Sequence, residues 1–109
     1  MKRTIIAGTA AVVLAFGLTS AALAFECPAR QKDAKAAIAK ATAAMKQMSP
    51  GANMQLVHTF IDDAKMMLQS GIHNHEKPQG GYDHGRSVAK AKAAEGYAYG
   101  AGVMARALK

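Results

Sequence analysis

The chain has one cysteine, Cys27, among its 109 residues. A single thiol excludes an internal disulfide, and the missing Cys-x-x-Cys-His sequence excludes the haem attachment of an ordinary c-type cytochrome. In an oxidising compartment an odd cysteine suggests either an intermolecular bridge or a reactive thiol. Two interpretations therefore stay open: Cys27 links two copies of the chain in a homodimer, or it has no functional role.

Large apolar side chains are also scarce beyond residue 24, where alanine is plentiful. They include Ile38, Leu56, Val57, Phe60, Ile61, Leu68, Ile72, Val88, Val103 and Leu108, together with six methionines. At about 0.8 kcal/mol per buried methylene, they give a thin core for an isolated helical unit. Extra stabilisation is therefore expected from dimerisation through helix faces, from a bound metal, or from both.

Signatures of catalysis and of phosphate binding are missing as well. The serines Ser49, Ser70 and Ser87 lie in no nucleophile motif, and no histidine lies beside Cys27 in the sequence. The Gly80-Gly81 pair precedes a predicted helix but lacks the Lys-Ser/Thr of a phosphate-binding loop. We therefore expect that the protein is not an enzyme.

The first 24 residues have the pattern of an export signal. Lys2-Arg3 supplies the positive start, an apolar run extends from Ile5 to Leu18, and Ala22-Leu23-Ala24 matches a small-x-small cleavage site. An uncleaved membrane anchor is the alternative, because about 20 apolar residues can also span a bilayer. We expect a signal peptide at residues 1–24, one mature domain at residues 25–109 without an integral membrane segment, and a periplasmic location.

The charge of the mature chain points to no particular polymer as a partner. Removal of residues 1–24 would leave 12 basic and 7 acidic side chains, a net charge of +5. The basic residues are scattered among alanines, so the pattern favours solubility and argues against nucleic-acid binding by an exported protein. Loose binding to anionic membrane surfaces stays a weaker alternative.

Helical periodicity begins at residues 29–48. Apolar residues recur there at three- and four-residue spacing, and the triplet Ser49-Pro50-Gly51 ends the pattern. The residues of this stripe are Ala34, Ile38, Ala41, Met45 and Met48. The methionines are expected to fill gaps in the core rather than to bind copper(I) or haem.

Two further helices are predicted at residues 54–70 and 82–107. Asn53 suits the N-cap of the first and Gly71 its end, and Asp83 can cap the second. The apolar stripe of residues 54–70 consists of Val57, Phe60, Ile61, Ala64, Met67 and Leu68. Within residues 82–107, small residues that would allow another backbone to approach closely recur at helical spacing: Ala89, Ala93, Gly96 and Gly100. The predicted fold is an all-α, antiparallel three-helix bundle.

Three of the four histidines lie in or next to the segment that joins the second and third predicted helices. His73 and His75 would lie on the same side of an extended segment, and glycines would let His84 fold back toward them. Glu76 and Asp83 can supply a fourth ligand or a supporting hydrogen bond. These donors suit zinc, copper(II) or nickel(II) in a loop-based site. The alternative is a set of solvated loop residues.

A second candidate pair lies on the second predicted helix, where His58 and Asp62 are four residues apart and share a face. They can hold a metal together, or form a surface hydrogen bond, and their distance along the helix keeps them out of the loop cluster.

In general plan the mature chain resembles the small periplasmic metal-binding helical proteins of proteobacteria. The resemblance rests on His58 ahead of Asp62-Asp63-Ala64-Lys65 and on Tyr82-Asp83-His84-Gly85-Arg86 leading into Val88-Ala89-Lys90-Ala91. It implies a helical bundle with one or two metal sites served by His58, His73, His75 and His84.

The sequence therefore predicts an exported helical protein that binds a divalent transition metal (Zn, Cu or Ni) through its histidine-rich interhelical loop. The competing prediction is a structural or adaptor module that self-associates or binds a partner helix without metal.

Overall fold

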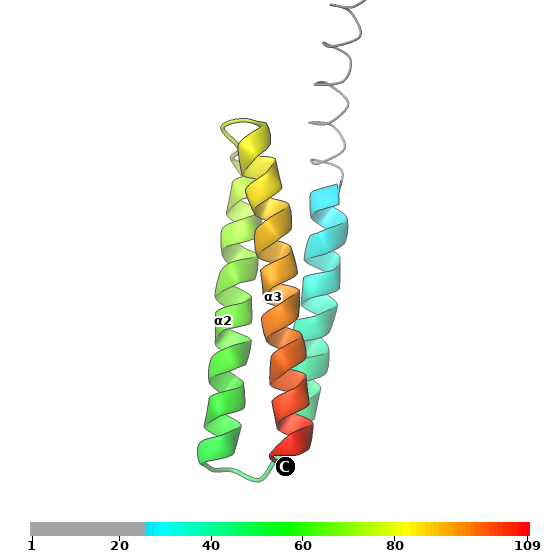
Figure 1. The fold of residues 1–109 in the computed structure, drawn as a ribbon, viewed down its shortest axis with the longest axis vertical. Helices are drawn as coiled ribbons and strands as arrows, with labels where there is room; N and C mark the ends of the chain where they lie inside the picture. Colours follow the sequence, from blue (N-terminus) through cyan, green and yellow to red (C-terminus); the bar gives the residue numbers. More distant parts are fainter. Residues whose placement is uncertain (1–25) are drawn as a thin grey trace, which may run out of the picture.

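The computed structural model describes residues 26–109, which form three helices packed side by side (Figure 1). The chain is helical from residue 26, where the described part begins, to residue 45, and continues in α2 (Ala52–Glu76) and α3 (Gly81–Ala107). No strand occurs in the described part. The predicted all-α, antiparallel three-helix bundle is confirmed, whereas the predicted signal peptide lies outside the described residues.

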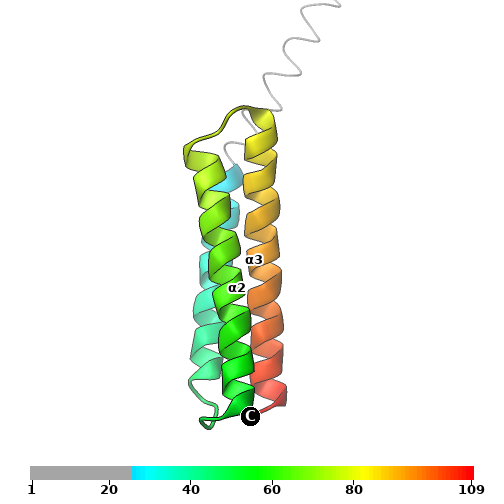
Figure 2. The same ribbon diagram turned by 90° about the vertical axis from the view of Figure 1, so that its left-hand side faces the viewer.

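In the view of Figure 1 the three helices run down, up and down again along the chain. α2 is antiparallel to both of its neighbours, so the helix at residues 26–45 is parallel to α3 (Figures 1 and 2). In consequence the start of the first helix, the end of α2 and the start of α3 lie at the same end of the bundle. None of the helices within residues 26–109 combines the length and the apolar character needed to cross a membrane.

The core follows the predicted faces of the first two helices. The whole predicted stripe of the first helix is buried: Ala34, Ile38, Ala41, Met45 and Met48. In α2 the buried residues include Val57, Ile61, Ala64 and Leu68, and Phe60 packs against them from the edge. The prediction that Met67 belongs to this core is wrong, because its side chain is exposed.

α3 uses a different face from the one that its glycines suggest. Its buried residues are mainly alanines, at positions 91, 94, 98, 101 and 105. In the predicted stripe, Ala89 and Gly96 are exposed, and a Cβ added at Gly96 would meet nothing within 4 Å. Gly100 faces a neighbouring helix, where its Cβ would lie 3.9 Å from the Phe60 ring, and Ala93 is partly buried. Half of the stripe is therefore open to solvent.

α2 ends several residues later than the sequence predicts. The helix does not stop at Gly71 but continues to Glu76, so His73 and His75 lie in its last turn and not in a loop. Gly71 is buried against α3, where an added Cβ would approach the Ser87 carbonyl oxygen to 3.1 Å. Gly71 has the sequence pattern of a residue that ends a helix, but here its missing side chain lets α2 pack closely against α3.

The predicted N-caps are also wrong, because the N-cap positions of α2 and α3 are occupied by glycines, Gly51 and Gly80. Asn53 lies inside α2, and its side chain donates a hydrogen bond to the Leu108 carbonyl across 3.5 Å. Asp83 lies in the first turn of α3, where its carboxylate accepts a 2.8 Å hydrogen bond from the Gln79 backbone N–H. Asp83 therefore stabilises the start of α3 from within the helix.

Candidate metal centre

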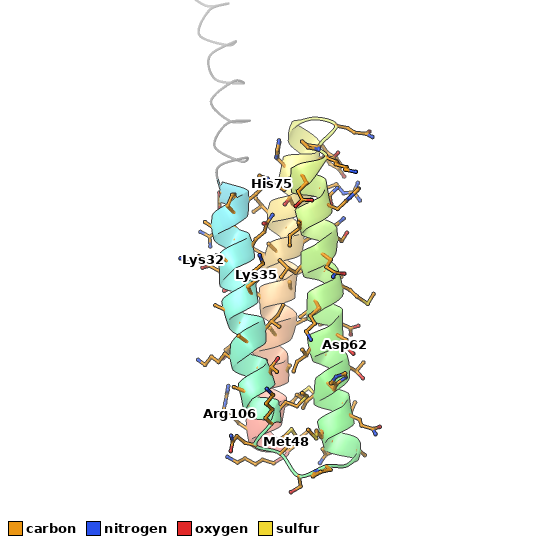
Figure 3. All side chains as sticks on the ribbon, turned by 180° about the vertical axis from the view of Figure 1, so that it is seen from behind. Lys32, Lys35, Met48, Asp62, His75 and Arg106 are labelled. Atoms are coloured by element: carbon orange, nitrogen blue, oxygen red, sulfur yellow. The ribbon has the colours of Figure 1, made fainter. Side chains whose placement is uncertain are left out.

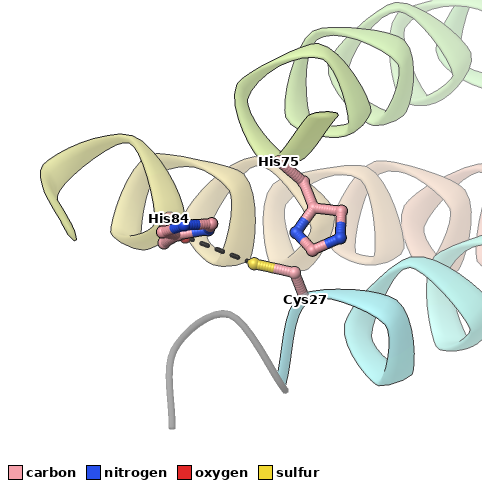
Figure 4. Close-up of side chains that lie close together, drawn as sticks. All are labelled: Cys27, His75 and His84. Carbon is pink, nitrogen blue, oxygen red and sulfur yellow. Dashed lines mark hydrogen bonds between the residues drawn. The ribbon is translucent and has the colours of Figure 1, made fainter. Parts of the chain in front are cut away.

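One end of the bundle brings together a cysteine and two histidines, one from each helix. Cys27 comes from the first helix, His75 from α2 and His84 from α3 (Figure 4). One potential ligand atom of each residue, the Cys27 Sγ and a ring nitrogen of each histidine, lies within 4.8 Å of the other two. We call these three residues the Cys-His-His cluster.

Cys27 points inward because it belongs to the same stripe as the core of its helix. Counting on from Cys27, the stripe continues at Ala34 and Ile38, so the seven- and four-residue intervals keep all three on one face. The thiol is completely buried and donates a hydrogen bond to the backbone carbonyl of His84, 3.5 Å away. A bridge between the Cys27 residues of two copies would require this first turn to leave the bundle.

A close crossing of α2 and α3 places the two histidines. Gly71 lies one turn before His75, and Ser87 lies one turn after His84. The buried Ser87 hydroxyl donates a 2.6 Å hydrogen bond to the Gly71 carbonyl, and the missing side chain at Gly71 permits this approach. The helices therefore meet one turn below the imidazoles and bring them into reach of each other.

A lysine on α3 also forms hydrogen bonds to α2 beside this crossing. The Lys90 ammonium donates hydrogen bonds of 2.7 Å to the Ser70 hydroxyl and to the Asn74 side-chain oxygen. Both acceptors lie on α2, directly before Gly71 and His75 in the sequence. These contacts restrain sliding between α2 and α3, and so they help to hold the distance between the histidines.

The two imidazoles touch and have unused hydrogen-bonding capacity. Their ring centroids are 5.8 Å apart, and the rings meet edge to face at 65°. The Nδ1 atom of each ring is buried and makes no hydrogen bond to the residues that the structure describes. Because an unsatisfied buried polar atom costs about 1–3 kcal/mol, a bond to a metal would be favourable at either nitrogen.

The other residues predicted for the loop site lie outside this cluster. His73 and Glu76 are exposed, and Asp83 is engaged with the Gln79 N–H. The physical reason for the separation of His73 and His75 is the helix. Two residues along an α-helix differ in direction by about 200°, whereas the predicted extended segment would have put both side chains on one side.

His58 and Asp62 form a separate pair on the surface of α2. The His58 Nδ1 lies 3.2 Å from an Asp62 carboxylate oxygen, with 59% and 49% of the two side chains exposed. His58 is about 25 Å along the helix axis from His75, at 1.5 Å per residue, and Figure 3 shows Asp62 far down α2 from His75. This pair cannot share an ion with the Cys-His-His cluster of its own chain.

The sequence pattern did not reveal Cys27 as a member of the site. Its partners are 48 and 57 positions away, and only the down-up-down topology brings them next to it. One signal was present in the sequence, because Cys27 continues the apolar stripe of its helix toward the amino terminus.

Comparisons of this chain with protein-family models, with curated proteins and with solved structures gave no match. No relative therefore assigns a role to the cluster, and its chemistry has to be derived from its own atoms.

The donor set is one thiol and two imidazoles. Sulfur and imidazole nitrogen favour zinc, copper and other transition metals, whereas magnesium and calcium prefer oxygen ligands. A nucleophilic role for Cys27 would need a substrate to reach its sulfur, and the side chain is completely buried. Metal coordination, which needs only a small ion between the three side chains, suits this geometry better.

Proposed function

We propose that this protein binds one transition-metal ion through Cys27, His75 and His84. The observation that carries the proposal is the approach of three potential ligand atoms, from three different helices, to within 4.8 Å of one another. The buried Nδ1 atoms that lack hydrogen-bond partners in the described part of the chain support it. The thiol must lose its proton and the imidazoles must be neutral, so binding releases protons and affinity falls in acid.

The ion would connect all three helices at one end of the bundle. The first helix is joined to α2 only at the opposite end, through residues 46–51. Coordination by Cys27 would tie the start of this helix to the pair formed by α2 and α3. This fits a chain whose core contains few large side chains, because an ion that binds only the folded state stabilises it by about 2.7 kcal/mol at one hundred times its Kd.

The location that the sequence predicts agrees with such a role. With the predicted signal peptide removed after residue 24, Cys27 would be the third residue of an exported, periplasmic protein. We propose a non-enzymatic metal-binding protein of the periplasm.

Equilibrium dialysis with zinc, copper and nickel salts tests the proposal. The unaltered protein should take up one ion, and Cys27→Ser, His75→Gln and His84→Gln should each lower the affinity by more than about 100-fold. His73→Gln is the matched control, because it removes an exposed imidazole two residues from His75 and should leave uptake unchanged. Equal uptake by all five proteins would refute the proposed site.

A structural or adaptor role without metal is the second candidate. It is favoured by the exposure of Ala89 and Gly96 on α3 and of the Tyr99 ring, which lies one turn after Gly96. Small residues on an open helix face let a second backbone approach closely. Sedimentation and thermal melting with and without a chelator separate the two functions. An oligomeric state and a melting curve that do not change when the chelator is added would favour the adaptor.

A further inference from the structure

We infer that the ion held by the Cys-His-His cluster is monovalent copper, Cu(I). This inference rests on the proposed metal-binding function and goes further, because it selects the charge and the coordination number of the ion from the surroundings of the three ligands.

The charge of the occupied site favours a monovalent ion. The Cys27 thiolate contributes one negative charge, and His75 and His84 bind as neutral rings. With Cu(I) the cluster is neutral, whereas Zn(II), Ni(II) or Cu(II) would leave it with one positive charge. A net charge held among buried groups is costly unless it is paired.

No carboxylate among the described residues joins the three ligand atoms to balance a divalent ion. Glu76 follows His75 in the chain but is exposed, and Asp83 precedes His84 but accepts a hydrogen bond from Gln79. The Lys90 ammonium brings a positive charge to Asn74, the residue before His75, and the Glu26 carboxylate beside Cys27 is paired with Arg30. The surroundings therefore favour the ion with the lower charge.

The number and the arrangement of the donors also favour Cu(I). A structural zinc ion is almost always held by four protein ligands, and a catalytic zinc ion by three protein ligands and a water, whereas copper(II) and nickel(II) prefer square-planar or tetragonal sets. Here three helices each supply one donor, which makes a triangle, and the structure places no fourth cysteine, histidine or carboxylate of the described chain within the group. Cu(I) has a filled d shell and accepts three donors, and soft thiolate ligands select it.

The burial of Cys27 agrees with this assignment. Its sulfur is completely shielded by the bundle, whereas the two histidines are only half-buried. A shielded thiolate excludes water from the sulfur side of the ion, and water is the usual fourth ligand of an open zinc site. Water can then approach the ion only from the side of the half-buried histidines, and this restricted access favours a three-coordinate ion.

The test is a pair of competition titrations on the purified protein. Cu(I), kept reduced with ascorbate without oxygen, is titrated against bicinchoninate, and Zn(II) is titrated against a chromophoric zinc chelator. We expect one Cu(I) per chain, bound at least about 100-fold more tightly than Zn(II), and a loss of more than about 100-fold in Cu(I) affinity on Cys27→Ser. His73→Gln should leave both affinities unchanged.

The outcomes separate the two levels of the proposal. Tighter binding of Zn(II) than of Cu(I), lost in His75→Gln and His84→Gln, would overturn the Cu(I) assignment and leave the metal site standing. Absence of binding by either ion, or Cu(I) binding that survives all three ligand substitutions, would overturn both. Circular dichroism of each variant checks its fold, and if Cys27→Ser is unfolded, the two glutamine variants decide the result.

Discussion

The two ends of the bundle bury different kinds of side chain. The end where the first helix turns into α2 is closed by apolar groups, with Met45, Met48 and Val57 buried. The opposite end buries the Cys27 thiol and the Ser87 hydroxyl, and it brings two imidazoles into contact. The difference separates two roles within one small fold, because the apolar end supplies stability and the polar end holds groups that can bind an ion.

The largest effect is expected from a substitution that damages only the apolar packing. Ile61 is almost completely buried one turn after Val57 in α2, so Ile61→Ala should lower the free energy of unfolding by about 2–5 kcal/mol. Urea unfolding monitored by circular dichroism measures this loss. Metal affinity, determined under conditions where the variant is still folded, should stay unchanged; a parallel loss of affinity would show that the two ends are not independent.

Acid should act mainly on the polar end. Protons compete with the metal for the Cys27 sulfur and for both imidazoles, so affinity should fall steadily as the pH is lowered. Isothermal titration calorimetry in buffers of different ionisation enthalpy should detect proton release on binding. Affinity that does not change with pH, with no proton release, would contradict coordination by these three groups.

The spacing between α2 and α3 can be changed without touching a ligand. In Gly71→Ala the new methyl group would lie 3.1 Å from the Ser87 carbonyl oxygen and 3.2 Å from the Lys90 Cβ, so α2 must move away from α3. Because His75 lies one turn further along, we expect metal affinity to fall by roughly 10–100-fold, the range seen when groups that orient metal ligands are altered. A chelator competition titration measures the change.

Gly96→Ala is the matched control for that substitution. A Cβ at Gly96 meets nothing within 4 Å, so the gain in helix propensity should stabilise the protein by up to about 1 kcal/mol. The affinity for metal should not change. If the two glycine variants had the same effect on affinity, the close crossing at Gly71 would have no role in placing the histidines.

The smallest effect is expected at the surface pair on α2. His58→Ala removes the 3.2 Å contact between the His58 ring and the Asp62 carboxylate. More than half of the His58 side chain is exposed. Exposed pairs contribute about 0–1 kcal/mol, so the melting temperature should change little and metal uptake should not change at all. A loss of one bound ion in this variant would identify a second site.

Periodicity was sufficient to predict the fold class and most of the core. The apolar spacing at Ala34, Ile38 and Met45 reports directly on one helix face, because burial repeats with the helical turn. Local rules failed at Gly71, since a glycine required for contact between helices looks in sequence like a glycine that ends one. The mistake at Gly71 then placed His73 and His75 on an extended segment.

Two of the three residues of the candidate site could be predicted, and the third could not. His75 and His84 were predicted from their chemistry and their closeness in sequence. Cys27 could not be assigned to them, because its approach depends on the direction of three helices and on a turn at the far end of the bundle. When each helix supplies only one residue of a site, no single stretch of sequence contains a recognisable motif.

X-ray absorption spectroscopy of the loaded protein examines the cluster most directly, because it counts the sulfur and nitrogen atoms bound to the ion. We predict one sulfur and two imidazole nitrogens, with the sulfur lost in Cys27→Ser and the spectrum unchanged in His73→Gln. A coordination sphere without sulfur in the unaltered protein would contradict the joint binding of an ion by Cys27, His75 and His84.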